Sequence, residues 1–420
     1  MGALLEFFLS IGRIFWIRFF KANNELSHFL NFSSTSDPKA STIYISCRNL
    51  MIGKYSGVNY WIEAITLSLI NEYNIVIYCQ SKKLFKKQTI THGNIKIVLL
   101  PLLLSLRLSS MAIETAWSKV LSSELDLLNQ DIILIGSISG CETHNIMIKN
   151  QLKAITLLVT DIRTHKYPQI SLVDKQDLSN FKGRILEYIN REAKIIQNPR
   201  SIFIADSQAI LENIKILFNL NFEPRTYVIP ISAQIDYCLP IQKKREILFI
   251  GRADKRKGLE YLIASWALIF DQISGWKLNI ATSRGDDLKV YRFLRLRKQK
   301  NFYYDLYLNI NDDLKHRLLN SASIVVLPSH YESFGIVALE AMQHGCVVVA
   351  NRVGGIPEVV GINGILVEAD NSLAFGNAML SLTNSGLILE DLSQKSRAVI
   401  KEEFNLEIMR DRIKNLIKSI

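Results

Sequence analysis

Two glutamates separated by seven residues, Glu332 and Glu340, are the side chains best placed in the sequence to do chemistry. On one continuous helix they would lie about 80° apart around the axis and ~12 Å apart along it. That separation is too long for two carboxylates that flank one glycosidic bond, as glycoside hydrolysis requires. The spacing favours an elongated ligand, with Glu332 in a loop and Glu340 one or two turns into a helix. The alternative is that both are solvated residues of an ordinary amphipathic helix.

The elements around these glutamates predict a ligand site. Val325–Leu327 reads as a buried strand and Val347–Ala350 as a second one, because both are fully apolar. Between them, Ser329–Phe334 is a polar loop, and Gly335–His344 has apolar residues at helical spacing. The loop therefore lies at the carboxyl end of a strand, where open α/β sheets bind ligands. Free N–H groups at the helix start, around Gly335 and Ile336, attract anions.

A second candidate element lies about eighty residues upstream, where a basic turn follows the apolar run Ile247–Ile250. Arg252 and Lys257 stand in this turn, ahead of a helix with one apolar stripe. Such cations suit a phosphate group, since arginine offers a bidentate fork and lysine a point charge. A basic turn alone is more often a solvated loop. We expect that of the intervening side chains, Asp254, Lys255 and Arg256.

The two elements together resemble a known enzyme family. ESFGIVALE matches the E-x7-E motif of retaining glycosyltransferases with the GT-B fold, family 4 or group 1, and GRADKRKG resembles that family's G-R-x4-K-G element. In the family the first glutamate contacts the donor sugar and the second holds the ribose hydroxyls, while the basic pair neutralises the donor diphosphate. The resemblance assigns these roles to Glu332, Glu340, Arg252 and Lys257. It also places Phe334, Gly335 and Ile336 in the donor site.

The resemblance is strong over about residues 245–370 and thin before them. Gly57 lies where the family carries a glycine pair near the donor phosphates, although a lone glycine is more often a turn. Thr160–Asp161 stands where many relatives have a histidine that contacts the sugar, and His165 follows four residues later. Either the first domain has adapted to an unusual acceptor, or activity is reduced or lost. A non-catalytic donor-binding or partner subunit is therefore the alternative function.

The strand and helix pattern predicts an α/β protein with parallel sheets. By resemblance the architecture is GT-B, with two Rossmann-like domains facing across a cleft. We expect an N-terminal segment and linker over residues 1–41, an acceptor domain over 42–235, a donor domain over 236–400, and a final helix over 401–420 that returns to the first domain. Strands are expected at the following ranges: Thr42–Cys47, Asn74–Cys79, Ile95–Leu100, Ile132–Ile135, Ile155–Val159 and Ile202–Ala205.

Composition limits the classes of ligand. The chain has 50 basic and 39 acidic residues, a net charge of +11, which suits nucleic acid, an anionic membrane or a phosphorylated small molecule. Because no nucleic-acid motif is present, we expect no nucleic-acid partner. The five cysteines and seven histidines show no metal-ligand spacing, so we expect reduced thiols, a cytoplasmic location and neither cofactor nor required metal.

The first 22 residues form a separate feature, dense in Phe, Ile, Leu and Trp but interrupted by charge. Their apolar runs are too short for a span of about 20 apolar residues, and no positive charge precedes them as in a secretory signal. Two interpretations stay open. The segment is a helix packed on the first domain, or it is an interfacial helix that holds the protein on the inner face of an anionic membrane.

The sequence thus predicts a nucleotide-sugar-dependent retaining glycosyltransferase. Its donor is a nucleotide-diphosphate sugar and its acceptor is a saccharide or a lipid-linked molecule, as in cell-envelope or exopolysaccharide synthesis. No metal is required by this logic, because Arg252, Lys257 and the helix start at Gly335 and Ile336 can carry the diphosphate charge.

Overall fold

The structure is a computed structural model of the 420-residue chain. It describes residues 41–47, 57–81, 87–101, 110–125, 132–135, 144, 153–157, 190, 193–199, 201–218, 225–233, 243–285, 287–297 and 304–420. The N-terminal segment, Thr160–Asp161 and His165 lie outside these ranges, and so does the residue at the expected domain boundary, 235. That boundary stays a prediction.

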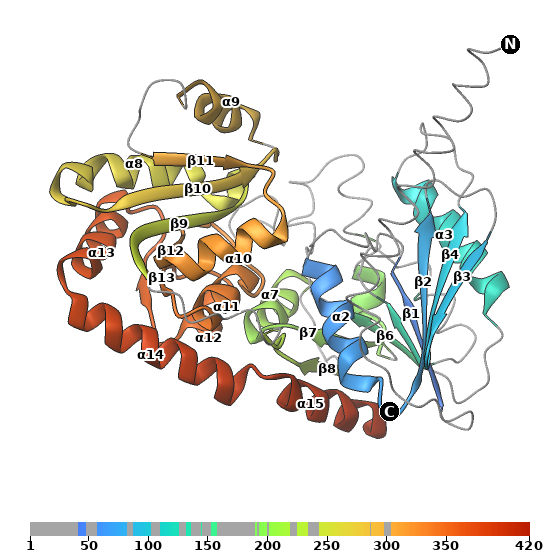
Figure 1. The fold of residues 1–420 in the computed structure, drawn as a ribbon. Coiled ribbons are helices and arrows are strands. Elements are labelled where there is room, and N and C mark those ends of the chain that lie inside the picture. Colours follow the sequence, from blue (N-terminus) through green and yellow to red (C-terminus); the bar gives the residue numbers. More distant parts are fainter. Residues whose placement is uncertain are drawn as a thin grey trace, which may run out of the picture. The chain divides into compact units, whose positions relative to one another are not determined.

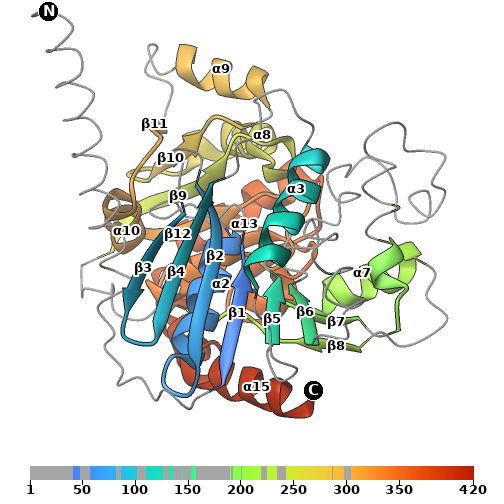
Figure 2. The same ribbon diagram turned by 90° about the vertical axis from the view of Figure 1, so that its right-hand side faces the viewer.

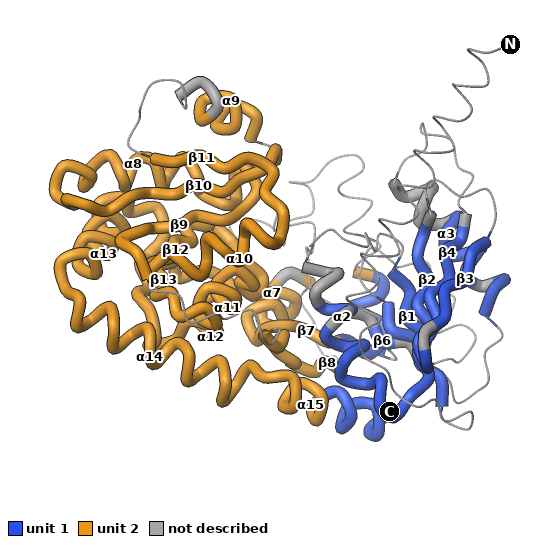
Figure 3. The backbone as a smooth tube through the Cα atoms, viewed as in Figure 1, with its two compact units in different colours: residues 1–160, 194–203, 413–420 blue, residues 161–193, 204–412 orange. Residues whose placement is uncertain are grey.

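The chain divides into two compact units (Figure 3). One consists of residues 1–160, 194–203 and 413–420, and the other of residues 161–193 and 204–412. The last helix, α15 (Leu406–Ser419), crosses from one to the other, and Lys414 near its end forms an ion pair with Glu72 inside the first unit.

The first sheet has, among the described residues, eight strands in the order β3-β4-β2-β1-β5-β6-β7-β8. Their bounds are β1 Thr42–Ser46, β2 Asn74–Ser81, β3 Gln88–His92, β4 Ile95–Pro101, β5 Ile132–Ile135, β6 Lys153–Leu157, β7 Ile202–Ala205 and β8 Arg225–Val228. β1 pairs in parallel with β2 and β5, β2 with β4, and β5 with β6. The expected strands are therefore present. The sequence reading missed β3, an antiparallel edge strand next to β4.

Two helices, α2 (Gly57–Leu69) and α3 (Ser110–Glu124), cover opposite faces of this sheet (Figures 1 and 2). Because side chains alternate along a strand, each face has its own apolar set. On the α3 face, Trp117 packs in one cluster with Tyr78, and its indole N–H donates to Ser46 Oγ at 3.2 Å. Trp61, on α2, is fully buried.

The second sheet has six strands within the described residues, in the order β11-β10-β9-β12-β13-β14. The bounds are β9 Lys244–Arg252, β10 Lys277–Ser283, β11 Tyr304–Leu308, β12 Ala322–Leu327, β13 Val347–Asn351 and β14 Ile365–Val367. Each strand is parallel to its neighbours. Every residue of β12 and β13 is buried, which explains why both sequences are almost continuously apolar.

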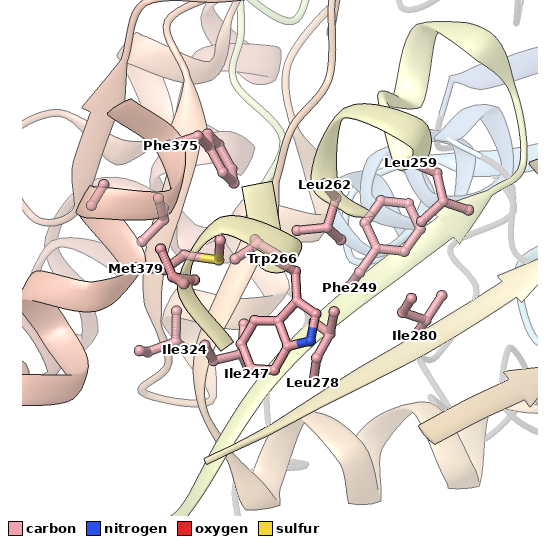
Figure 4. Packing of buried hydrophobic residues seen from close by; sticks show 14 of the residues in the cluster. Ile247, Phe249, Leu259, Leu262, Trp266, Leu278, Ile280, Ile324, Phe375 and Met379 are labelled. Carbon is pink, nitrogen blue, oxygen red and sulfur yellow. The ribbon is translucent and has the colours of Figure 1, made fainter. Parts of the chain in front are cut away.

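Helices α8 (Leu259–Ile269) and α13 (Ser372–Asn384) pack on this second sheet. Figure 4 shows Trp266 of α8 lying over Ile247 and Leu278, and Phe249 lying between Leu259 and Ile280. Other helices among the described residues of this unit are α7 Gln208–Phe218, α9 Leu288–Arg297, α10 Asp312–Ser321, α11 Ile336–Gln343, α12 Ile356–Val360 and α14 Gly386–Glu403. The expected helix Gly335–His344 is thus confirmed as α11, one residue shorter at each end.

Within the described part of the chain, every helix is either too short or too polar to cross a membrane.

A tight turn at Gly258 links the basic loop after β9 to the end of β12. A single 3-10 turn covers Lys255–Lys257, and Gly258 then adopts a φ of 65° before α8 begins. A Cβ atom at this position would lie 1.9 Å from the carbonyl oxygen of Pro328. Only glycine therefore allows the turn that carries Lys257 to lie against the loop after β12.

We predict that Gly258→Ala destabilises the fold by more than about 2 kcal/mol, because the new methyl group overlaps backbone and the left-handed conformation itself costs roughly 1–2 kcal/mol. Urea unfolding measures the change. Gly386→Ala is the matched control, because a Cβ there meets nothing within 4 Å. Its stability should stay within about 1 kcal/mol of wild type. Equal stability of the two variants would contradict the packing argument.

Candidate functional site

The candidate site lies where the loops after β9 and β12 meet. β9 and β12 are parallel neighbours, so their carboxyl ends lie at one edge of the sheet. The loop after β9 carries Arg256 and Lys257, and the loop after β12 carries Glu332. The backbones are joined, because the N–H of His330 donates to the carbonyl of Arg256 at 2.8 Å. This edge is the position at which parallel sheets bind ligands.

The carboxylate of Glu332 collects most of the polar contacts at this edge. Lys257 Nζ bonds to its Oε1, and Ser329 Oγ donates to the same oxygen at 2.9 Å. Arg256 Nη1 lies 3.6 Å from Oε2. The Glu332 residue is only 7% exposed. Two cations and one hydroxyl therefore hold a nearly buried carboxylate.

The pKa of Glu332 is lower than its ordinary value of 4.5, although two opposing effects act on it. Burial is the larger single effect and would raise the pKa, but the charges of Lys257 and Arg256, with the hydrogen bonds from Lys257 and Ser329, outweigh it. Glu332 is consequently ionised at neutral pH. Its negative charge lies beside Lys257 and Arg256 and partly offsets their positive charge.

A third loop, after β13, supports Glu332 from its backbone side. Gly354 has a φ of 51°, and a Cβ on it would lie 1.8 Å from the carbonyl oxygen of Glu332. The N–H of Gly355 donates to that same oxygen at 3.1 Å. Asn351, at the end of β13, donates through Nδ2 to the carbonyl of Ser329 at 3.1 Å. Glycine at 354 thus permits the close approach that fixes the loop.

The start of α11 lies next to Glu332 and presents backbone N–H groups. Its first residue is Ile336, and the residue before it, Gly335, has a φ of 103° and makes no side-chain capping bond. Phe334 is buried and packs edge-on against Phe404 with ring centroids 6.1 Å apart. Phe334 thus anchors the loop in the core, while the N–H groups at the helix start suit an anion.

Glu340, one turn further along α11, has a lysine of its own. Lys315 on α10 donates from Nζ to Glu340 Oε1 at 2.7 Å, and both residues are buried. Asp312 Oδ1 lies 3.8 Å from the same ammonium group. The two glutamates of the sequence motif are therefore held by different lysines from different elements.

The two predicted cations, Arg252 and Lys257, differ in their contacts and in their exposure. Lys257 contacts Glu332, whereas Arg252 is 65% exposed in its side chain and pairs with Asp254 at 3.3 Å. Arg256, which the sequence reading expected to be solvated, contacts Glu332 and lies 3.5 Å from the carbonyl of Tyr331. Gly57 begins α2 in the first unit. Sequence inspection missed Arg256, Lys315 and Ser329, and nothing in their spacing singled them out.

A further carboxyl, Asp206, lies buried in the second unit at the end of β7. After it, Ser207 donates through Oγ to the carbonyl of Ser333 at 2.7 Å, which ties this segment to the Glu332 loop. The first N–H groups of α7, those of Gln208 and Ala209, donate to the Glu358 carboxylate, each at 2.8 Å. Among the described atoms, Asp206 Oδ1 has no hydrogen-bond partner.

Asp206 has the opposite pKa shift to Glu332. Burial is the main cause that raises its pKa well above 3.8, and the negative charges of Glu358 and Glu332 add to the increase. An unfolded chain releases this proton near its ordinary pKa, whereas the folded chain retains it to higher pH. The folded state therefore loses stability, relative to a neutral side chain, as pH rises above 3.8.

We predict that Asp206→Asn becomes more stable relative to wild type as pH rises from 5 to 8, by up to about 1.4 kcal/mol per pH unit until the folded-state pKa is reached. Urea unfolding at both pH values measures this difference. Asp391→Asn, at an exposed side chain, is the control and should show the same difference from wild type at both pH values. A pH-independent effect of Asp206→Asn would contradict a buried neutral acid.

Part of the second unit is similar in sequence to known proteins. Residues 244–385 match the family Glycosyl transferases group 1. An uncharacterized glycosyltransferase of Methanocaldococcus jannaschii is 35% identical over a 182-residue alignment, which covers 39% of this chain and 44% of that protein. An N-acetyl-alpha-D-glucosaminyl L-malate synthase of Bacillus anthracis is 27% identical over 202 residues, 47% of this chain and 51% of that protein. The match thus spans about half the length of these relatives.

Solved structures extend the likeness to most of the chain. A sucrose-phosphate synthase from Thermosynechococcus elongatus matches with a TM-score of 0.75 at 19% identity, covering 90% of this chain and 98% of that one. The Anabaena protein HepE, solved in complex with UDP, matches with a TM-score of 0.64 at 15% identity, covering 90% and 100%. The chain is an α/β protein with the GT-B fold, as the sequence predicted.

Proposed function

We propose that the protein is a retaining glycosyltransferase that moves a sugar from a nucleotide-diphosphate donor to a saccharide or lipid-linked acceptor in glycan synthesis. The observation that carries the proposal is the ionised Glu332 held by Lys257 and Arg256 at the carboxyl ends of β9 and β12. The group 1 match over residues 244–385 and the UDP complex of the HepE structure support it.

The cations of the site suit the leaving group of such a reaction. When the bond between the anomeric carbon and the donor phosphate oxygen breaks, negative charge develops on the diphosphate. Lys257, Arg252 and the N–H groups at the start of α11 can stabilise that charge without a metal, because fixed donors aimed at developing charge lower the barrier. The acceptor oxygen then bonds to the anomeric carbon on the same face, and its proton passes to the leaving phosphate oxygen.

Glu332 has two tasks in this proposal. Before the donor binds, its carboxylate pairs with Lys257 and lies near Arg256, and both cations are partly buried. When the diphosphate arrives, Lys257 can turn to it, and the released carboxylate can accept hydrogen bonds from the donor sugar. Lys257 would thus exchange one anionic partner for another, so that its partly buried charge always has an anionic partner.

The alternative function is a subunit that binds the donor but transfers nothing. The two differ in one respect that can be measured, because both predict nucleotide-sugar binding and only the enzyme predicts hydrolysis or transfer. A thermal-shift panel of UDP-, GDP- and ADP-sugars comes first. At a concentration of about 100 times Kd, a ligand of the folded state adds roughly 2.7 kcal/mol of stability. Absence of any shift would count against both functions.

We predict that Lys257→Ala and Arg252→Ala each lower turnover by about 10²–10³-fold with the donor found in that panel, because each removes a charge from the leaving diphosphate. Steady-state transfer or donor hydrolysis, corrected for folded protein, measures the loss. Lys395→Ala is the control, because Lys395 pairs with Asp391 on the exposed face of α14. Wild-type turnover in the Lys257 variant would refute its role. Glu332→Gln should abolish transfer while the nucleotide still binds.

We also propose that residues 1–22 bring the enzyme to an anionic membrane surface, where a lipid-linked acceptor would be available. The aromatic residues of this segment and the net charge of +11 support the proposal. Cosedimentation with anionic liposomes tests it. The full chain should bind, and a chain without residues 1–36 should bind less. Equal binding by both chains would contradict the proposal, as would no binding by the full chain.

A further inference from the structure

We infer that Lys315 is a positioning residue that orients the Glu340 carboxylate for the two hydroxyls of a ribose, and so makes the site select ribonucleotides over 2′-deoxyribonucleotides. The inference rests on the proposed function, in which Glu340 holds the ribose. It adds a residue outside both sequence motifs, on a different helix from Glu340.

The geometry of the pair is well defined. Lys315 lies in the second turn of α10, whose start is fixed by the Asn311 side chain accepting from the N–H of Leu314 at 3.0 Å. α10 leads into β12, and α11 follows β12, so both helices border the same strand. The ammonium of Lys315 reaches Glu340 Oε1 at 2.7 Å, and both side chains are about nine-tenths buried.

The contact leaves part of the carboxylate for a ligand. A carboxylate has two oxygens and about four lone-pair positions. Among the residues that the structure describes, the hydrogen bond to this carboxylate comes from Lys315 and reaches Oε1. Oε2 and one position of Oε1 can therefore accept from two neighbouring hydroxyls. A fixed orientation matters here, because a freely turning carboxylate would lose conformational freedom on binding.

Neighbouring groups fix the same segment of α11. His344 Nδ1 lies 2.7 Å from the carbonyl oxygen of Glu340, and His316 Nδ1 lies 3.2 Å from His344 Nε2. His316 follows Lys315 directly on α10, so Lys315 contacts the Glu340 side chain, while His316 contacts His344, which in turn contacts the Glu340 backbone. The ion pair with Lys315 thus orients the carboxylate, while the two histidines fix the backbone from which its side chain extends.

A purely stabilising role gives a different expectation. A buried ion pair contributes little net stability compared with apolar residues of similar volume, since both ions lose their hydration. If Lys315 served only the fold, its removal would weaken binding of ribose and 2′-deoxyribose nucleotides alike. If it orients Glu340, its removal would weaken the ribose form more. The ratio of the two affinities separates these roles.

The experiment is calorimetric titration of the full chain with UDP, ADP and GDP and with the 2′-deoxy form of each. For the nucleotide that binds wild type, we expect a preference for the ribose form of about 10-fold or more, because a hydrogen bond to a charged group is lost in the deoxy form. Lys315→Met should reduce this preference to less than about threefold. In a Glu340→Gln background, Lys315→Met should have no further effect on the ratio.

The experiment includes a control variant and a second variant at Lys315. Lys243→Met is the matched control, because Lys243 donates to the carbonyl of Leu319 and to Cys346 Sγ nearby but does not bond to Glu340. It should keep the wild-type ratio. If Lys315→Met does not fold, Lys315→Gln retains a donor of similar reach without the charge and should lose part of the preference.

The outcomes separate the inference from the function on which it rests. If wild type binds none of the nucleotides, the proposed function fails. If wild type prefers the ribose form and the Lys315 variants keep that preference, the inference is overturned and the proposed function stands. A similar loss of preference in Lys243→Met would also overturn it, because the effect would then not depend on the contact between Lys315 and Glu340.

Discussion

The ion pair between Glu332 and Lys257 is the constraint on which the arrangement of the second unit depends. A carboxylate that is 7% exposed is costly to ionise, and here cations from the loop after β9 offset that cost. This requires β9 and β12 to be parallel neighbours, so that their carboxyl ends meet. It also requires glycine at 258 and 354, where a Cβ would overlap the backbone of the opposing loop. Sheet order, turn chemistry and charge therefore support one another.

The candidate site contains two lysine–glutamate ion pairs whose surroundings differ in charge. Lys257 with Glu332 lies in loops, whereas Lys315 with Glu340 joins two helices. Each pair is neutral by itself, and Arg256 adds a positive charge to the first. A ligand that is anionic at one part and rich in hydroxyls at another fits this division, because the cations suit phosphate oxygens and the carboxylates accept from hydroxyls. That combination is the chemistry of a nucleotide sugar.

The sequence could predict the elements better than the partners of the side chains. Continuous apolar runs identify β12 and β13, and helical spacing identifies α11, because burial dictates those patterns directly. β3 was missed because none of its described side chains is fully buried, and Ile90 is the one apolar residue in this edge strand. Arg256 and Lys315 were missed for another reason. Their partners lie 75 and 25 positions away, and only the fold brings them together.

The opposite pKa shifts of Glu332 and Asp206 follow from what surrounds each carboxyl. Both are buried, but Glu332 has two cations beside it, while Asp206 lies within the influence of two other carboxylates. Active sites often shift the pKa values of two carboxyl groups in opposite directions, so that one acts as an acid and the other as a base. Here the difference has an electrostatic consequence for binding. A raised pKa at Asp206 lowers the negative charge that this carboxyl places near Glu332, which favours the attraction of an anionic ligand to Lys257 and Arg256.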